Sequence, residues 1–179
     1  LGAMGYGLPA ALGGAVACRG GRVISVDGDG GFQLNIQELA TVARLRLPIK
    51  FFILSNNGYA SIRASQRNYL GTWMACDPDT GLQIPDTCKV AQAYGIPASR
   101  VTDPKELAGV IRSALVSPGP SLVEIMVHPD QAIGPRISTV ARSDGTMVSR
   151  PLEDLWPFLD REEFRANMMI EPLPESASV

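Results

Sequence analysis

Three apolar runs of strand length, separated by other segments, constrain the fold of this chain more than any other feature. They lie at residues 22–26, 49–54 and 121–127, and the second run, IKFFIL, is apolar almost throughout. A strand that is apolar on both sides is typical of a parallel sheet covered on both faces. If the intervening segments are helical, the sequence predicts an α/β domain.

Signals of helix starts support that interpretation in the first half of the chain. Residues 8–18 have the composition of a small-residue helix, with Pro9 in the first turn, where its missing N–H is harmless. Asn35 and Glu38 have the spacing of a capping box, which predicts a helix over residues 35–45 and gives Glu38 a structural role.

The second half of the chain continues the alternation. Helices are expected at residues 86–94 and from Asp103 to about residue 116, with a short strand between them. The predicted fold is therefore a three-layer, doubly wound α/β domain, with a mostly parallel sheet and helices on both faces. We expect this domain to span residues 1–130.

Residues 131–179 differ in character from the rest. Residues 131–150 are polar and are expected to be irregular, and residues 152–169 predict short helical pieces broken at Pro157. We interpret residues 131–179 as a C-terminal extension that packs on the domain or on a partner. The chain begins inside a glycine-rich turn, so we also expect the domain to be truncated at its N-terminus.

Charge and cysteine usage exclude several classes of function. The formal net charge is −2 and no run of Lys or Arg occurs, which argues against nucleic acid as a partner. No apolar stretch approaches the roughly 20 residues of a membrane span. Cys18, Cys76 and Cys88 are odd in number and lack CxxC spacing, which favours a reducing, cytoplasmic location over disulfides or a zinc site. His128, the single histidine, is expected to end a strand rather than bind a metal.

Two polar segments directly follow the first two predicted strands. One is GDGG at residues 28–31, and the other is SNNGY at residues 55–59. Either segment alone resembles an ordinary turn. If the two strands are neighbours, however, both segments meet at one edge of the sheet, where ligands of open parallel sheets bind. Carboxylate, amide and backbone oxygens suit Mg²⁺ or Ca²⁺, and glycine N–H groups suit the phosphates that accompany Mg²⁺.

Here the sequence resembles a known family. The first Asn of the NN pair follows Asp29 by 27 positions, as in the thiamine diphosphate motif. The segments GDGGFQLNIQELAT, LPIKFFILSNNGY and GAMGYGLPAALG resemble the C-terminal cofactor domain of the acetolactate synthase, pyruvate oxidase and benzoylformate decarboxylase group. The resemblance extends from residue 1 to about residue 127, and a weaker likeness in the tail points to acetolactate synthase-like proteins of unassigned substrate.

The resemblance implies a set of site residues. The predicted Mg²⁺ ligands are Asp29, the Asn56 side chain and the Gly58 carbonyl. The residues expected to contact thiamine diphosphate are Gly2, Met4, Gly28, Gly30, Gly31, Tyr59, Ala60 and Ser61. Among these, Gly2 is expected to accept a hydrogen bond from the aminopyrimidine, and Met4 to support the bent shape of the cofactor.

The resemblance also implies an activity and its partners. It indicates decarboxylation of a 2-keto acid, with transfer of the acyl carbanion to an acceptor as a possible further step. The family's catalytic glutamate belongs to an N-terminal domain of the neighbouring subunit, so no catalytic residue is assigned in this chain. We therefore expect the isolated chain to be inactive, a homodimer or homotetramer to form through the cofactor domains, and FAD to be possible in a further domain.

This sequence departs from acetolactate synthases at the substrate side. Those enzymes carry Gly-Met-Val and a nearby Trp after the second motif, where this chain has Ala60, Ser61, Ile62 and, at the Trp position, Ser65. The substrate pocket is therefore expected to differ from that of a housekeeping acetolactate synthase.

Two alternatives remain open at this point. Residues 5–10, GYGLPA, fit GxGxxA and Asp27 ends the following strand, which together would suit a nicotinamide- or flavin-dinucleotide-binding domain. That alternative leaves the Gly-Asp-Gly and Asn-Asn segments unexplained. The other alternative is a non-catalytic module that serves only assembly.

Overall fold

The computed structural model describes residues 2–131, 134–141 and 145–177, so residue 1, in the predicted glycine-rich turn, lies outside it. The chain divides into two compact units, residues 1–130 and 131–179, which are described separately. Within the described residues, no helix combines the length and apolar character needed to cross a membrane.

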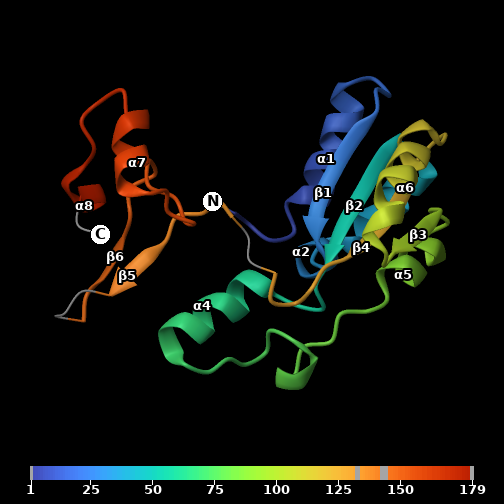
Figure 1. The fold of residues 1–179 in the computed structure, drawn as a ribbon. Coiled ribbons are helices and arrows are strands. Elements are labelled where there is room, and N and C mark those ends of the chain that lie inside the picture. Colours follow the sequence, from blue (N-terminus) through green and yellow to red (C-terminus); the bar gives the residue numbers. More distant parts are fainter. Residues whose placement is uncertain (1, 132–133, 142–144, 178–179) are drawn as a thin grey trace. The chain divides into compact units, whose positions relative to one another are not determined.

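The first unit is built on a four-stranded parallel sheet (Figure 1). The strand order is β1-β2-β4-β3, and every neighbouring pair is parallel. The bounds are β1 Val23–Gly28, β2 Ile49–Ser55, β3 Ala98–Val101 and β4 Ser121–Met126. The predicted strands, their parallel arrangement and the adjacency of the first two are therefore confirmed.

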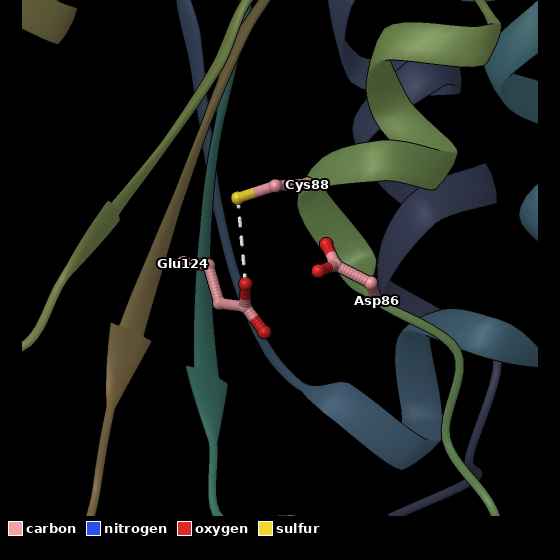
Figure 2. Close-up of side chains that lie close together, drawn as sticks. All are labelled: Asp86, Cys88 and Glu124. Carbon is pink, nitrogen blue, oxygen red and sulfur yellow. Dashed lines mark hydrogen bonds between the residues drawn. The ribbon is translucent and has the colours of Figure 1, made fainter.

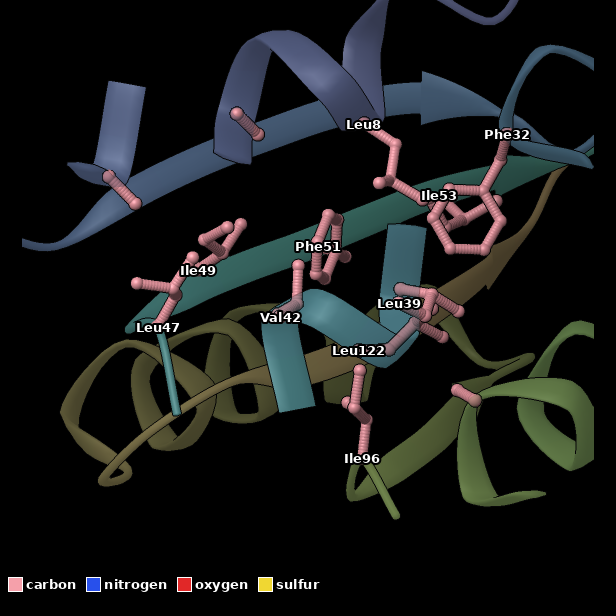
Figure 3. Close-up of a cluster of buried hydrophobic side chains, with 13 residues drawn as sticks. Leu8, Phe32, Leu39, Val42, Leu47, Ile49, Phe51, Ile53, Ile96 and Leu122 are labelled. Carbon is pink, nitrogen blue, oxygen red and sulfur yellow. The ribbon is translucent and has the colours of Figure 1, made fainter. Parts of the chain in front are cut away.

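Strand β2 lies inside the sheet and divides its side chains between two hydrophobic clusters. Ile49, Phe51 and Ile53 are completely buried on one face, where they pack with helices α1 (Gly7–Ala17) and α3 (Leu39–Arg44) (Figure 3). Phe52 points to the other face and packs with helix α6 (Pro104–Val116). Because burying one such side chain stabilises a fold by about 1.5–3 kcal/mol, the near-continuous apolar run fixes β2 between two layers.

Helices cover both faces of the sheet, as predicted for a three-layer domain. Asp86 and Asp103 cap α5 and α6 by accepting hydrogen bonds from the backbone N–H groups of Lys89 and Lys105, both at 2.9 Å. The bounds of the helices that supply side chains to the two clusters are α1 Gly7–Ala17, α2 Asp29–Gln33, α3 Leu39–Arg44, α5 Thr87–Ala93 and α6 Pro104–Val116.

The helix predicted over residues 35–45 forms as a short 3-10 helix (Ile36–Glu38) followed by α3, but its predicted capping box is wrong. Helix α2 (Asp29–Gln33), which precedes it, was not predicted. Asn35 caps nothing: its Oδ1 accepts from the Gln37 side chain at 3.3 Å, and its Nδ2 donates to the Gly5 carbonyl at 2.7 Å. Glu38 likewise makes no capping bond, so capping does not explain it. The two ends of the Asn35 amide thus bond to a distant backbone group and to a neighbouring side chain, not to the helix start.

The sequence analysis also missed helix α4 (Ala60–Leu70), which ends at Gly71 in the left-handed conformation. Most of its side chains are exposed, and Arg63 is its one buried residue. An apolar periodicity, which is the usual signal of a helix, is therefore absent from this segment.

The second unit contains a small antiparallel hairpin and two short helices. Its hairpin, β5 Thr139–Ala141 and β6 Met147–Ser149, shows that the prediction of an irregular segment over residues 131–150 is wrong for those strands. Of the short helical pieces predicted over residues 152–169, all of which the structure describes, α7 (Arg161–Asn167) forms after the predicted break at Pro157, but no helix precedes that break. Helix α8 is Pro174–Ala177. Residues 132–133 and 142–144 of the predicted irregular segment lie outside the described residues.

Candidate functional site

The site lies where β1 and β2 end side by side. Gly28 of β1 pairs with Leu54 of β2, so the segments that follow both strands leave the sheet at the same edge. Residues 28–31 do not form the expected loop, because Asp29–Gln33 is helix α2, with Gly28 as its extended N-terminal residue. The N–H groups of Gly30 and Gly31 therefore belong to the first turn of a helix, where N–H groups lack helical partners.

Asp29 is the buried acid of this site, with 1% of its surface exposed. Its Oδ1 accepts from Gly30 N at 2.9 Å, and its Oδ2 accepts from Asn57 N at 2.8 Å and Gly58 N at 3.2 Å. The Ser55 hydroxyl also donates to Oδ2, at 3.4 Å. These bonds hold the carboxylate rigidly against the segment that follows β2.

Burial raises the pKa of Asp29 above its ordinary value, and the bonds from the Gly30, Gly58, Asn57 and Ser55 donors offset part of that rise. A buried carboxylate is costly unless a positive charge accompanies it. No Lys or Arg within the described ranges forms an ion pair with Asp29. The carboxylate is thus organised by neutral donors and can accept a cation.

Asn56 supplies the second oxygen. Its side-chain Oδ1 is buried and has no hydrogen-bond partner among the described residues. Buried carbonyl oxygens almost always have a partner, so an orphaned one in the residue next to Asn57, whose N–H donates to Asp29, suits a bound cation. Carboxylate and amide oxygens are hard ligands, which favours Mg²⁺ or Ca²⁺ over zinc.

Gly58 has a backbone conformation that suits glycine. Its φ is +150°, following Asn57 at φ +62°. A Cβ at residue 58 would overlap the Cys76 carbonyl oxygen, and the Tyr59 N–H donates to that same oxygen at 2.8 Å. The Gly58 carbonyl oxygen lies 3.6 Å from the position that a Cβ on Gly30 would take. The predicted third metal ligand therefore lies beside the start of α2.

The other predicted cofactor residues lie at helix starts. Tyr59 is the N-terminal flanking residue of α4, and Ala60 and Ser61 are in its first turn. A Cβ on Gly30 would collide with the Tyr59 ring, so these two helix starts approach each other closely. Gly2 and Met4 precede α1 and are exposed, Met4 by 43%. Both are thus accessible to a ligand.

Sequence reasoning missed several groups around this site. Ser55 contacts Asp29 directly, and its place at the end of a buried strand was the available signal. Arg63 of α4 is 5% exposed, and its Nη2 donates to the Pro129 carbonyl at 2.6 Å. A cavity of about 460 Å³ lies between α4 and the segment around residues 71–80, and Asn56 reaches it together with Arg63.

A second group of potential metal ligands lies on the first unit, at Asp86, Cys88 and Glu124 (Figure 2). Its ligand atoms lie within 4.8 Å of one another. However, Arg100 already pairs with both acids, with Nε 2.8 Å from Glu124 Oε2 and Nη2 3.1 Å from Asp86 Oδ2. Burial, together with the adjacent Glu124, raises the pKa of the Cys88 thiol to about 12. We therefore interpret this group as an ion-pair network with a protonated thiol.

Comparisons with known proteins agree with the geometry. A family model described as "Thiamine pyrophosphate enzyme, C-terminal TPP binding domain" matches residues 1–125. Acetolactate synthase 2, chloroplastic, of Zea mays is 41% identical over 143 residues, which cover 76% of this chain and 22% of that protein. A probable acetolactate synthase large subunit of Methanocaldococcus jannaschii is 37% identical over 133 residues, covering 74% and 22% of the two chains.

A solved structure is also similar to this chain. The thiamine diphosphate-dependent 4-hydroxybenzoylformate decarboxylase of Rhodococcus jostii RHA1 superposes with a TM-score of 0.62 and 28% sequence identity. The superposition covers 70% of this chain and 23% of that one. This chain therefore spans about a fifth of the length of the curated relatives described above.

Proposed function

Because this chain belongs to the thiamine pyrophosphate enzyme family, as a C-terminal cofactor-binding domain, we propose that it binds thiamine diphosphate through Mg²⁺ at the edge formed by β1 and β2. The observation that carries the proposal is the orphaned Asn56 Oδ1 in the segment whose Asn57 and Gly58 N–H groups donate to the buried Asp29 carboxylate. The dinucleotide-binding alternative is not favoured, because it leaves unexplained the two segments that converge here.

Different residues of the chain would contact the metal ion, the diphosphate and the pyrimidine. Asp29, Asn56 Oδ1 and the Gly58 carbonyl would hold Mg²⁺, the hard-oxygen set that this ion prefers. Backbone N–H groups at the starts of α2 and α4, other than those of Gly30 and Tyr59, which donate to Asp29 and to the Cys76 carbonyl, would hold the diphosphate, since helix starts favour anions. Gly2 and Met4 would contact the pyrimidine half of the cofactor. When bound, thiamine diphosphate supplies an electron sink for carbanion chemistry.

For the whole protein we propose an acetolactate synthase-like reaction that begins with decarboxylation of a 2-keto acid. The named activities of the similar proteins support this class, and the departures from acetolactate synthases at Ala60, Ser61, Ile62 and Ser65 favour a different substrate pocket. No residue of this chain is assigned as the catalytic acid or base, so we propose that a glutamate of another domain completes the site. FAD in a further domain stays a prediction.

The binding proposal is tested by calorimetric titration of the whole protein with thiamine diphosphate at fixed Mg²⁺. Asp29→Asn keeps the shape of the side chain, removes its charge and replaces one N–H acceptor by a donor, so the affinity should fall by at least about a hundredfold. Glu106→Gln removes one charge from the exposed surface of α6 and should leave the affinity unchanged. Equal affinity of Asp29→Asn and the unaltered protein would reject the site.

The assembly proposal has its own test. We propose a homodimer or homotetramer in which the cofactor domain of one chain faces the glutamate of its neighbour. Mixing whole-protein Asp29→Ala with a variant lacking that glutamate should restore part of the activity, because one hybrid site has both parts intact. Fully active monomers would contradict this arrangement, as would proven subunit exchange without rescue.

We also propose that the protein is cytoplasmic. Cys18, Cys76 and Cys88 are all free, which supports a reducing compartment such as the cytoplasm. Fractionation of cells that express the tagged whole protein would check it, and recovery outside the cytoplasmic fraction would contradict it.

A further inference from the structure

The segment before α1, residues 2–6, is held by a side chain that the binding motif does not include. Asn35 Nδ2 donates to the Gly5 carbonyl oxygen at 2.7 Å, across 30 positions of sequence. Gly5 has φ +82°, and a Cβ there would lie 2.9 Å from both Asn35 Nδ2 and Leu34 Cβ. The backbone of Gly5 therefore sits directly against the residues that connect α2 to the 3-10 helix.

The backbone on both sides of Asn35 is fixed by buried side chains. Phe32, three residues before it, is 1% exposed, and Leu39, four residues after it, is completely buried. Both side chains belong to the hydrophobic cluster on the α1 side of the sheet (Figure 3). Because packed side chains of this kind hold their backbone rigidly, the Asn35 amide has a fixed position relative to Asp29 at the start of α2.

The side chains of residues 2–6 contribute little packing that would fix the position of this segment. Gly2 has no side chain, Met4 is 43% exposed and Tyr6 is 70% exposed. At Gly7, where α1 begins, the backbone lies against the carboxylate of Asp27, since a Cβ there would be 2.6 Å from Asp27 Oδ2. The segment is thus fixed at Gly7 by close packing and at Gly5 by the Asn35 hydrogen bond.

We propose that Asn35 is a positioning residue that sets the place of the pyrimidine-binding segment relative to the diphosphate site. The proposal rests on the proposed function. Asp29 and the start of α2 would hold the diphosphate end, and residues 2–4 would contact the pyrimidine end. The Asn35 bond joins the two halves through one short connection. Its loss would release the pyrimidine side and leave the diphosphate side in place.

Two ligands separate these halves in an experiment on the whole protein. Thiamine diphosphate uses both halves, whereas inorganic diphosphate uses only the Mg²⁺ and phosphate side. At fixed Mg²⁺, Asn35→Leu, which keeps the approximate shape without a donor, and Asn35→Ala should each raise the Kd of thiamine diphosphate about tenfold. Their Kd for inorganic diphosphate should change by less than about twofold.

The matched control is Gln37→Ala. Gln37 is exposed and donates to Asn35 Oδ1 over a longer 3.3 Å, so its removal leaves the bond to Gly5 intact. Both ligands should bind this variant as they bind the unaltered protein. A loss of thiamine diphosphate affinity in Gln37→Ala equal to that in Asn35→Leu would overturn the proposal.

Other results are equally decisive. Equal weakening of both ligands in the Asn35 variants, or loss of folding in both, would show a structural role and overturn the proposal. Unchanged affinity for both ligands would do the same. If the unaltered protein binds neither ligand, the proposed function itself has failed. If the unaltered protein binds both ligands and the Asn35 variants keep its ratio of the two Kd values, only the positioning role is rejected.

Discussion

Replacing Gly58 by alanine perturbs the site at its most constrained backbone position. Gly58 donates to Asp29 Oδ2 at 3.2 Å, and the next N–H, from Tyr59, donates to the Cys76 carbonyl oxygen at 2.8 Å. A new Cβ would overlap that oxygen and would lie 3.1 Å from the carbonyl carbon of Cys76 and 3.2 Å from Asp77 Cα. All of these atoms are backbone, so no side-chain rotation can relieve the contact.

Two costs add in this variant. Holding a non-glycine residue at φ +150° costs about 1–3 kcal/mol, and forcing a methyl group into packed backbone costs about a further 1–3 kcal/mol. The expected loss in free energy of unfolding is thus about 2–6 kcal/mol, a large part of the roughly 5–15 kcal/mol that stabilises a typical domain. The Gly58 carbonyl would also move, so binding of Mg²⁺ should weaken.

Gly71→Ala is the matched control, because Gly71 also has positive φ, +67°, but a Cβ there meets nothing within 4 Å. Its expected cost is the conformational part alone, about 1–2 kcal/mol. Urea unfolding of both variants of the whole protein measures the difference. Equal unfolding free energies for Gly58→Ala and Gly71→Ala would refute the claim that the Cys76 contact constrains this loop.

Three further predictions follow from the buried and exposed polar groups. Burial raises the pKa of Asp29, and only the ionised carboxylate binds a cation, so the Mg²⁺ affinity should begin to fall at a higher pH than for an ordinary aspartate. Below that pKa, a calorimetric titration series should show a fall of about tenfold per pH unit. An affinity that does not change with pH would contradict this prediction. The buried Lys50 ammonium donates to Ser117 and to the Gly119 carbonyl, and Lys50→Met leaves these acceptors without that donor. The variant should therefore lose about 1–3 kcal/mol of unfolding free energy in urea. Unchanged stability would contradict this prediction. At neutral pH, iodoacetamide should modify the exposed Cys18 much faster than Cys88, because the thiol pKa of Cys88 is raised to about 12. Peptide mass spectrometry measures both rates. Equal rates would contradict the interpretation of Asp86, Cys88 and Glu124 as an ion-pair network with a protonated thiol.

The features that the sequence predicted correctly are those in which local pattern and tertiary packing agree. The apolar run of β2 indicates a strand buried on both faces, and Ile49, Phe51 and Phe52 are buried as that pattern requires. Parallel strands that follow one another in sequence and pair in space bring Asp29 and residues 55–58 to one edge. Strand order alone therefore makes the convergence of these two segments predictable.

The features that the sequence did not predict depend on contacts distant in sequence or on weak local patterns. Asn35 and Glu38 have capping-box spacing, but Asn35 donates to the Gly5 carbonyl, 30 positions away, and its Oδ1 accepts from the Gln37 side chain instead of a backbone N–H. Helix α4 lacks an apolar stripe because its surface is mostly exposed. Strands β5 and β6 have three residues each, too few to show an alternation of side chains. The orphaned oxygen of Asn56 is a property of packing, which no spacing reveals.

A crystal structure of the whole protein grown with Mg²⁺ and thiamine diphosphate tests the central claim most directly. The account predicts one Mg²⁺ ion with the Asp29 carboxylate, Asn56 Oδ1 and the Gly58 carbonyl oxygen each at about 2.0–2.1 Å, and diphosphate oxygens completing its coordination. It also predicts that the Asp29 bonds to the Asn57 and Gly58 N–H groups persist. A cofactor bound elsewhere, or an ion that Asn56 does not contact, would contradict the account.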